Sequence, residues 1–235
     1  MRRWLLPCLL AVTAAAAPKE FSSGPRRVHL LELYSSEGCS SCPPAEAWLG
    51  GLQREAGLWR DFVPVAFHVN YWDRLGWRDR FASTEFTARQ YAYARDWGSS
   101  SVYTPGFVLD GAEWGRATGT GALAAGAKVA GELKVVWQDD GVCRVTFAAR
   151  GDYEVHAALL AGGIVSAVRA GENDGRTLHH EFIALALKSA PLHAGVAEIA
   201  LPKSTEPGIA RQALAVWVTR RGELTPVQAT GGWLE

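Results

Sequence analysis

The order of apolar segments in the first half of the chain restricts the possible folds most strongly. Residues 28–34 (VHLLELY) and 62–69 (FVPVAFHV) are short apolar runs of the kind that form buried strands. From Ala45 onward, apolar residues recur at helical spacing, and residues 84–97 form a second amphipathic segment. A third strand is expected within 101–111 (SVYTPGFVLDG). Strand–helix–strand–helix–strand predicts an α/β layer with at least two parallel strands.

The second half has a different pattern. From Gly131 onward, short runs rich in β-branched and apolar residues alternate with turn sequences such as Asp-Asp-Gly and Asn-Asp-Gly. These runs predict an antiparallel sheet or a small sandwich, with a domain boundary between residues 130 and 131. Cys143 alternates with polar neighbours in one of the runs, so we expect its thiol to face the apolar side of a strand and to be inert.

Two cysteines three residues apart, Cys39 and Cys42, lie between the first predicted strand and the first predicted helix. Unpaired N–H groups and the helix dipole lower the pKa of a thiol at a helix N-terminus. We therefore expect Cys39 to be the nucleophile and Cys42 to be the resolving thiol that closes a disulfide with it. A C-x-x-C motif beside a βαβ pattern is typical of thioredoxin-like redox proteins.

The dipeptide Thr104-Pro105 supports this interpretation. In a thioredoxin fold, the loop before the third core strand carries a cis proline that faces the cysteine pair, and cis peptide bonds are essentially confined to X-Pro. Thr104 and Pro105 are thus predicted to hold a substrate chain by backbone contacts. Tyr71 and Trp72 follow the second strand, at the sheet edge where the cysteines are expected, and are predicted to line the rim of the site.

Five blocks of sequence carry a resemblance to a known family: LELYSSEGCSSCPPAEAWL, FHVNYWDRLGW, FASTEFTARQYAYA, SVYTPGFVLDG and GENDGRTLHH. In this order they resemble the secreted bacterial proteins grouped as domain of unknown function 1223, which are similar to thioredoxin-like proteins. The resemblance implies an α/β thioredoxin-like N-terminal domain, which we place at residues 26–130. An all-β C-terminal region, an antiparallel sheet or sandwich, would follow at residues 131–235.

Glu32 is an acidic residue inside an otherwise apolar predicted strand, where a carboxylate is costly unless it is paired. One hypothesis makes it the proton acceptor for Cys42, the role of a buried acid in thioredoxins. Its position seven residues before Cys39 differs by one from the usual six. The alternative is a salt bridge or a hydrogen bond to the backbone.

Histidines offer a different chemistry. His68 could be a third ligand beside Cys39 and Cys42, although a lone histidine on an apolar strand is more often a core residue. His179 and His180 are adjacent in a predicted strand, so their side chains should point to opposite faces. No metal site is predicted there.

The N-terminus predicts export. Arg2 and Arg3 precede an apolar run and a series of small residues that ends at Ala17, as in a secretory signal peptide covering residues 1–17. Its removal leaves 22 basic and 24 acidic residues, a formal charge of −2. No basic stripe for nucleic acid and no later run of transmembrane length is present in the sequence. We expect a periplasmic or secreted protein.

These features predict an exported thiol–disulfide oxidoreductase that acts through Cys39 and Cys42 on protein or small-thiol disulfides, without a cofactor. Two alternatives remain open. One is a periplasmic copper or zinc binding or delivery module that uses Cys39, Cys42 and His68. The other is a non-catalytic binding protein on a thioredoxin-like scaffold, with a structural disulfide.

Overall fold

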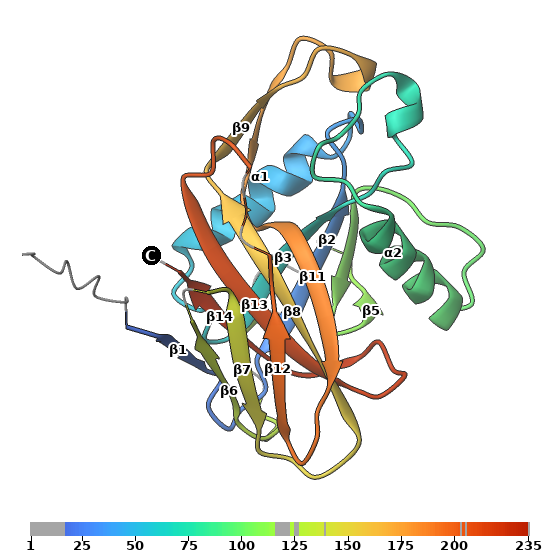
Figure 1. Cartoon of the computed structure of the whole chain (residues 1–235). Helices are drawn as coiled ribbons and strands as arrows, with labels where there is room; N and C mark the ends of the chain where they lie inside the picture. Colours follow the sequence, from blue (N-terminus) through green and yellow to red (C-terminus); the bar gives the residue numbers. More distant parts are fainter. Residues whose placement is uncertain are drawn as a thin grey trace, which may run out of the picture.

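The computed structural model describes residues 17–115, 123–124, 127–138, 140–202, 204 and 206–234. The predicted signal peptide therefore lies, except for Ala17, outside the described residues. The described part contains fourteen strands and two α-helices (Figure 1). None of its helices has the length and apolar character needed to cross a bilayer.

The largest element is a mixed sheet of eight strands. In spatial order they are β14 (Pro226–Trp233), β13 (Arg211–Arg220), β8 (Tyr153–Gly162), β11 (Ile183–Pro191), β3 (Phe62–His68), β2 (His29–Ser35), β4 (Gly106–Leu109) and β5 (Ala112–Glu113). Strands β2 and β3 are parallel, as predicted, and β3 is also parallel to β11. The other neighbours are antiparallel.

A second sheet and a hairpin complete the strand structure. The second sheet contains, in spatial order, β1 (Lys19–Ser22), β6 (Leu133–Trp137), β7 (Val142–Phe147) and β12 (Val196–Ala200). Strands β9 (Ile164–Ala167) and β10 (Thr177–His180) form a separate antiparallel hairpin. Between them lies the short 3-10 helix η5 (Gly171–Asn173).

The two α-helices cover opposite faces of the large sheet (Figure 1). Helix α1 (Pro43–Gly51) contacts one face, where Trp48 packs on Phe107, the partner of Leu33 across strands β2 and β4. Neighbouring residues of a strand point to opposite faces. Glu32 accordingly points to the other face, where Arg89 of helix α2 (Thr84–Asp96) binds it. Two further 3-10 turns, η1 (Leu52–Arg54) and η2 (Asp73–Leu75), follow α1 and β3.

Strands β8 and β13 are buried on both faces, and this explains their almost uninterrupted apolar sequences. Leu160 and Trp217 belong to the core shared with β2, β3 and the helices. Leu159 and Val216 belong to a second core, which packs against the small sheet. Cys143 lies in this second core and is fully buried, as the sequence predicts, and its burial raises the thiol pKa to about 12.

The prediction of an α/β thioredoxin-like domain followed by a separate all-β region is wrong. The described chain is mainly β-sheet, and strands of both halves share the eight-stranded sheet. Strands of the two halves meet where β11 pairs with β3, at Ile183 and Ala66. Gln228 on β14 also accepts a hydrogen bond from the backbone of Val28 (2.8 Å) and donates one to Arg26 (2.9 Å). The predicted domain boundary at residue 130 concerns whether the two parts fold independently, and it stays a prediction.

Candidate functional site

Cys39 and Cys42 form a disulfide in the turn that leads into α1, with their Cα atoms 5.4 Å apart. Cys42 is the N-cap residue, and Pro43 and Pro44 occupy the first helical turn. Proline suits these positions because their backbone N–H groups would have no partner within the helix. The carbonyl of Cys42 accepts from the backbone N–H of Ala45 (2.9 Å), so the motif continues directly into the helix.

The disulfide is closed off from solvent, since both cysteines are 0 % exposed. Trp72 lies against the turn just before Cys39, since a Cβ at Gly38 would lie 3.0 Å from the Cβ of Trp72. The indole of Trp72 donates to the hydroxyl of Thr104 (2.8 Å). Ser40 and Ser41, between the cysteines, are exposed.

The Thr104–Pro105 peptide bond is cis, as predicted. Its loop lies beside the cysteine motif, because the hydroxyl of Ser41 reaches both the carbonyl of Thr104 (3.5 Å) and the sulfur of Cys39 (3.3 Å). Tyr71, the other predicted rim residue, donates to Gln90 on α2 (3.3 Å). Burial raises the pKa of Tyr71 to about 12. The Thr104–Pro105 loop therefore flanks the cysteine motif and is hydrogen-bonded to Trp72.

A loop from the second half holds the motif in place. The buried side-chain amide of Asn173 donates to the carbonyls of Glu37 (2.8 Å) and Cys39 (2.9 Å). Glu172 accepts from both the backbone N–H (3.0 Å) and the hydroxyl (2.7 Å) of Ser40. The segment between β9 and β10 thus fixes the backbone on both sides of Cys39.

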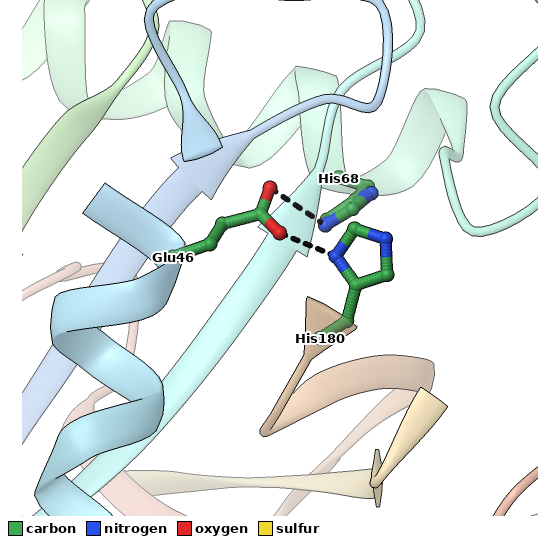
Figure 2. A group of neighbouring side chains, drawn as sticks. All are labelled: Glu46, His68 and His180. Carbon is green, nitrogen blue, oxygen red and sulfur yellow. Dashed lines mark hydrogen bonds and ion pairs between the residues drawn. The ribbon is translucent and has the colours of Figure 1, made fainter. Parts of the chain in front are cut away.

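Behind the disulfide, a group of charged side chains is buried between α1, β3 and β10. The carboxylate of Glu46 on α1 faces the imidazole rings of both His68 and His180 (Figure 2). It is hydrogen-bonded to Nδ1 of His180 and to the hydroxyl of Ser35, and its Oε1 lies 3.6 Å from Nε2 of His68. One ligand atom from each of Glu46, His68 and His180 lies within 4.8 Å of the other two.

Two more carboxylates hold the outer nitrogens of these rings. Nδ1 of His68 is 2.7 Å from Asp79, and Nε2 of His180 is 3.2 Å from Glu37. Glu37 is fixed in turn, because the indole of Trp77 donates to its carboxylate (2.7 Å). Each ring therefore has one nitrogen toward Glu46 and the other toward a separate carboxylate.

Opposite charges within the cluster offset the cost of burial. Burial alone would lower the pKa of His180, but Glu46 and Glu37 raise it to about 10. Burial likewise acts against the charge of His68, yet Asp79 raises the pKa of this ring above its usual value. Burial favours the neutral form of Glu46, but His180 and His68 hold the pKa of the carboxyl below its ordinary range.

Comparison with known proteins places the chain in a family. Residues 30–219 match the family described as protein of unknown function (DUF1223). The chain belongs to this family. No functionally curated protein matches the chain.

Two solved structures show the same overall fold as this DUF1223 chain. One is a protein from Agrobacterium tumefaciens, with 23 % identity and a TM-score of 0.61 over 88 % of this chain and 94 % of that one. The other is HBP35 of Porphyromonas gingivalis, with 12 % identity and a TM-score of 0.54 over 89 % of this chain and 76 % of that one.

In the structure, two of the predicted site residues of this DUF1223 chain have partners other than the cysteines. Glu32 forms a two-pronged ion pair with Arg89 (2.7 and 2.9 Å) on the α2 face, which corresponds to the salt-bridge alternative. His68 contacts Asp79 and Glu46. Among the described residues, the group able to share a metal ion contains His180 and Glu46 beside His68, and neither cysteine.

Sequence reasoning missed four members of the site: Glu37, Glu46, Asp79 and His180. His179 is exposed and His180 is buried, so their side chains do point to opposite faces. Only the face of β10 that carries His180 contacts α1. The sequence feature that could have indicated these residues is the block GENDGRTLHH. It contains Asn173, which donates to the carbonyl of Cys39, and His180, which pairs with Glu46.

Proposed function

We propose that the protein exchanges disulfides with protein or small-molecule thiols through Cys39 and Cys42, after export to the periplasm or the cell exterior. The observation that supports this most directly is the arrangement of the pair at the N-terminus of α1, beside the Thr104–Pro105 loop. A helix N-terminus stabilises the thiolate that attacks or leaves in such reactions. No cofactor is needed for the exchange.

The proposed reaction has two steps. The thiolate of Cys39 attacks a substrate disulfide, forms a mixed disulfide and releases one substrate thiolate. The thiolate of Cys42 then attacks the sulfur of Cys39, which closes the protein disulfide and releases the second substrate thiolate. The substrate is reduced and the protein oxidised by two electrons, and the same steps reversed oxidise a substrate dithiol.

Access to the sulfurs requires a local movement, because both cysteines are enclosed. The contact best placed to open is the hydrogen bond between Trp72 and Thr104, since Trp72 lies over Gly38 and is only partly buried. Its opening would expose the side of the motif that faces the Thr104 carbonyl. A substrate chain could then bond to the backbone of this loop.

Trapping of a mixed disulfide tests the proposal. The probe is a labelled peptide whose single cysteine carries glutathione, and all proteins also carry Cys143→Ala. The reduced Cys42→Ser variant should release glutathione and keep the peptide on Cys39, whereas the matched Cys39→Ser variant should not. The protein with both Cys39 and Cys42 should release the peptide. Equal trapping by both variants, or trapping by neither, would assign the disulfide a structural role.

Export is tested separately. When the chain is expressed with its own N-terminus in a bacterium, the protein recovered from the periplasm or medium should begin close to Pro18. N-terminal sequencing of that material checks this. Exported protein that still carries Arg2 and Arg3 would contradict the predicted cleavage.

A further inference from the structure

We infer that Glu46, His68 and His180 form a binding site for one divalent transition-metal ion, such as zinc or iron(II), buried between α1, β3 and β10. This inference is independent of the proposed disulfide exchange. It rests on the positions of the three side chains and of the carboxylates around them.

The first argument is the direction of the inner ring nitrogens. Nε2 of His68 makes no hydrogen bond among the described residues, although its side chain is 0 % exposed, and it lies 3.6 Å from Oε1 of Glu46. Buried polar atoms without a partner are rare in folded proteins. Nδ1 of His180 also faces Glu46 (Figure 2). A metal ion would give Nε2 of His68 the partner that it lacks and would be bound by Nδ1 of His180 and by Glu46 as well.

The second argument is the outer shell. Histidines that bind a metal usually donate their other ring N–H to a carboxylate, which fixes the tautomer and the orientation of the ring. Here Nδ1 of His68 is hydrogen-bonded to Asp79 (2.7 Å), whereas Nε2 of His180 and Glu37 form an ion pair (3.2 Å) that lacks hydrogen-bond geometry. Backbone N–H groups of Glu37 (2.8 Å) and Phe81 (2.9 Å) in turn hold Asp79.

The third argument is charge. The cluster contains three buried carboxylates and two imidazoles, so it is negative even when both rings are protonated. This excess of buried carboxylates favours a bound cation, because buried charges are paired or coordinate metals. Two imidazoles and a carboxylate form a ligand set that zinc and iron(II) accept, with further coordination positions left for water or Ser35.

A pocket reaches the cluster from the surface. It has a volume of about 380 Å³, and its wall is formed by Glu37, Trp77, Arg78, Arg80, Val165, Ser166 and Ala167. Glu37 is the member of the cluster that lines it, so an ion would enter past this carboxylate. Once bound, the ion would join α1, β3 and β10, and its role would be to stabilise the fold around the cysteine motif.

Metal titration of the full-length protein tests the inference. The probes are zinc(II), followed by binding calorimetry, and cobalt(II), followed by absorption. The protein should bind one equivalent of each, and the cobalt spectrum should lack a thiolate-to-metal charge-transfer band. The Cys39→Ser/Cys42→Ser variant should bind equally well. The two proposals can therefore fail separately. Metal binding would persist without disulfide exchange, and disulfide exchange would persist without metal binding.

Matched variants locate the site. His180→Gln should abolish one-to-one binding, whereas His179→Gln, which changes the exposed neighbour, should leave it intact. Asp79→Asn should weaken zinc binding about 10- to 100-fold, because it changes only the outer shell. Zinc should also raise the melting temperature of the wild type but not that of His180→Gln. Absence of binding by the wild type, or its loss on removal of the cysteines, would overturn the inference.

Discussion

Glu32 and Glu46 are both buried carboxylates near the start of the chain, but they lie on opposite faces of the large sheet. Glu32 faces α2 and is bound by Arg89, Tyr34 and Tyr93. Its place in the strand accounts for this, because its neighbour Leu33 points to the α1 face and adjacent residues of a strand point to opposite faces. The acid on the face of the cysteine motif is Glu46, supplied by α1 itself.

Replacement of Glu32 by Gln should therefore reduce stability strongly. The change leaves the Arg89 guanidinium buried without its carboxylate, which typically costs about 3–5 kcal/mol. Urea unfolding at neutral pH measures the loss. The control is Glu20→Gln at an exposed position of β1. A Glu32→Gln protein as stable as this control would show that the ion pair contributes little.

A second prediction for a single residue concerns His156 and the pH dependence of stability. Burial, together with Arg89, lowers the pKa of this histidine from 6.5 to about 3 in the folded protein. Below pH 6.5 the unfolded chain therefore binds a proton that the folded chain does not. The stability linked to His156 is complete above pH 6.5 and falls as the pH drops toward 3, by about 1.4 kcal/mol per pH unit.

Urea unfolding between pH 7 and pH 4 checks this dependence. The His156→Gln variant should lose less stability over this range than the wild type, because it lacks the group that takes up the proton. His193→Gln, at an exposed position, should follow the wild type. Parallel curves for wild type and His156→Gln would contradict the depressed pKa.

At the scale of elements, local patterns predicted the structure around the cysteines well. Apolar runs located β2 and β3, and helical spacing located α1 and α2. The position of Thr104-Pro105 relative to the C-x-x-C motif located the cis bond. Contacts between distant segments were beyond such reasoning. The approach of Asn173 to the carbonyl of Cys39 joins residues 134 positions apart, and no local pattern specifies it. The same holds for His180 and Glu46.

The loop between β9 and β10 should control the rigidity of the cysteine motif. Asn173→Ala removes the donors to the carbonyls of Glu37 and Cys39, and we expect it to cost about 1–3 kcal/mol. Reduction of the disulfide by dithiothreitol should become faster than in the wild type. The exposed neighbour Asp174, replaced by Ala, is the control. An unchanged reduction rate would mean that the loop does not restrain the motif.

At the scale of the molecule, the two halves of the sequence share the eight-stranded sheet and the larger of the two cores. Trp217 of β13 packs against Phe67 of β3 (6.5 Å between ring centroids) and against the Arg89 guanidinium (5.1 Å). Trp59 contacts Phe182 and Trp233 in the same way (5.8 and 5.5 Å). The sequence suggested two units because turn residues and a change of pattern separate the halves, although the long apolar runs of β8 and β13 require cover on both faces.

A truncated chain tests this unity. Residues 18–130 alone should lack a cooperative unfolding transition, because β3 loses β11 and the core loses Trp217. In the full chain, urea curves from tryptophan fluorescence and far-ultraviolet circular dichroism should coincide, as expected for one cooperative unit. A soluble fragment with its own cooperative transition would support the division at residue 130.

The position of β11 also sets the order of events during synthesis. Strand β3 emerges early, but its neighbour on one side, beginning at Ile183, is made more than a hundred residues later. The loop that encloses Cys39 and the histidine that faces Glu46 come just before that strand. Until then the cysteines lack this cover, and the edge of β3 stays unpaired. Cys39 and Cys42 therefore stay accessible to thiol chemistry for the whole interval before the sheet closes.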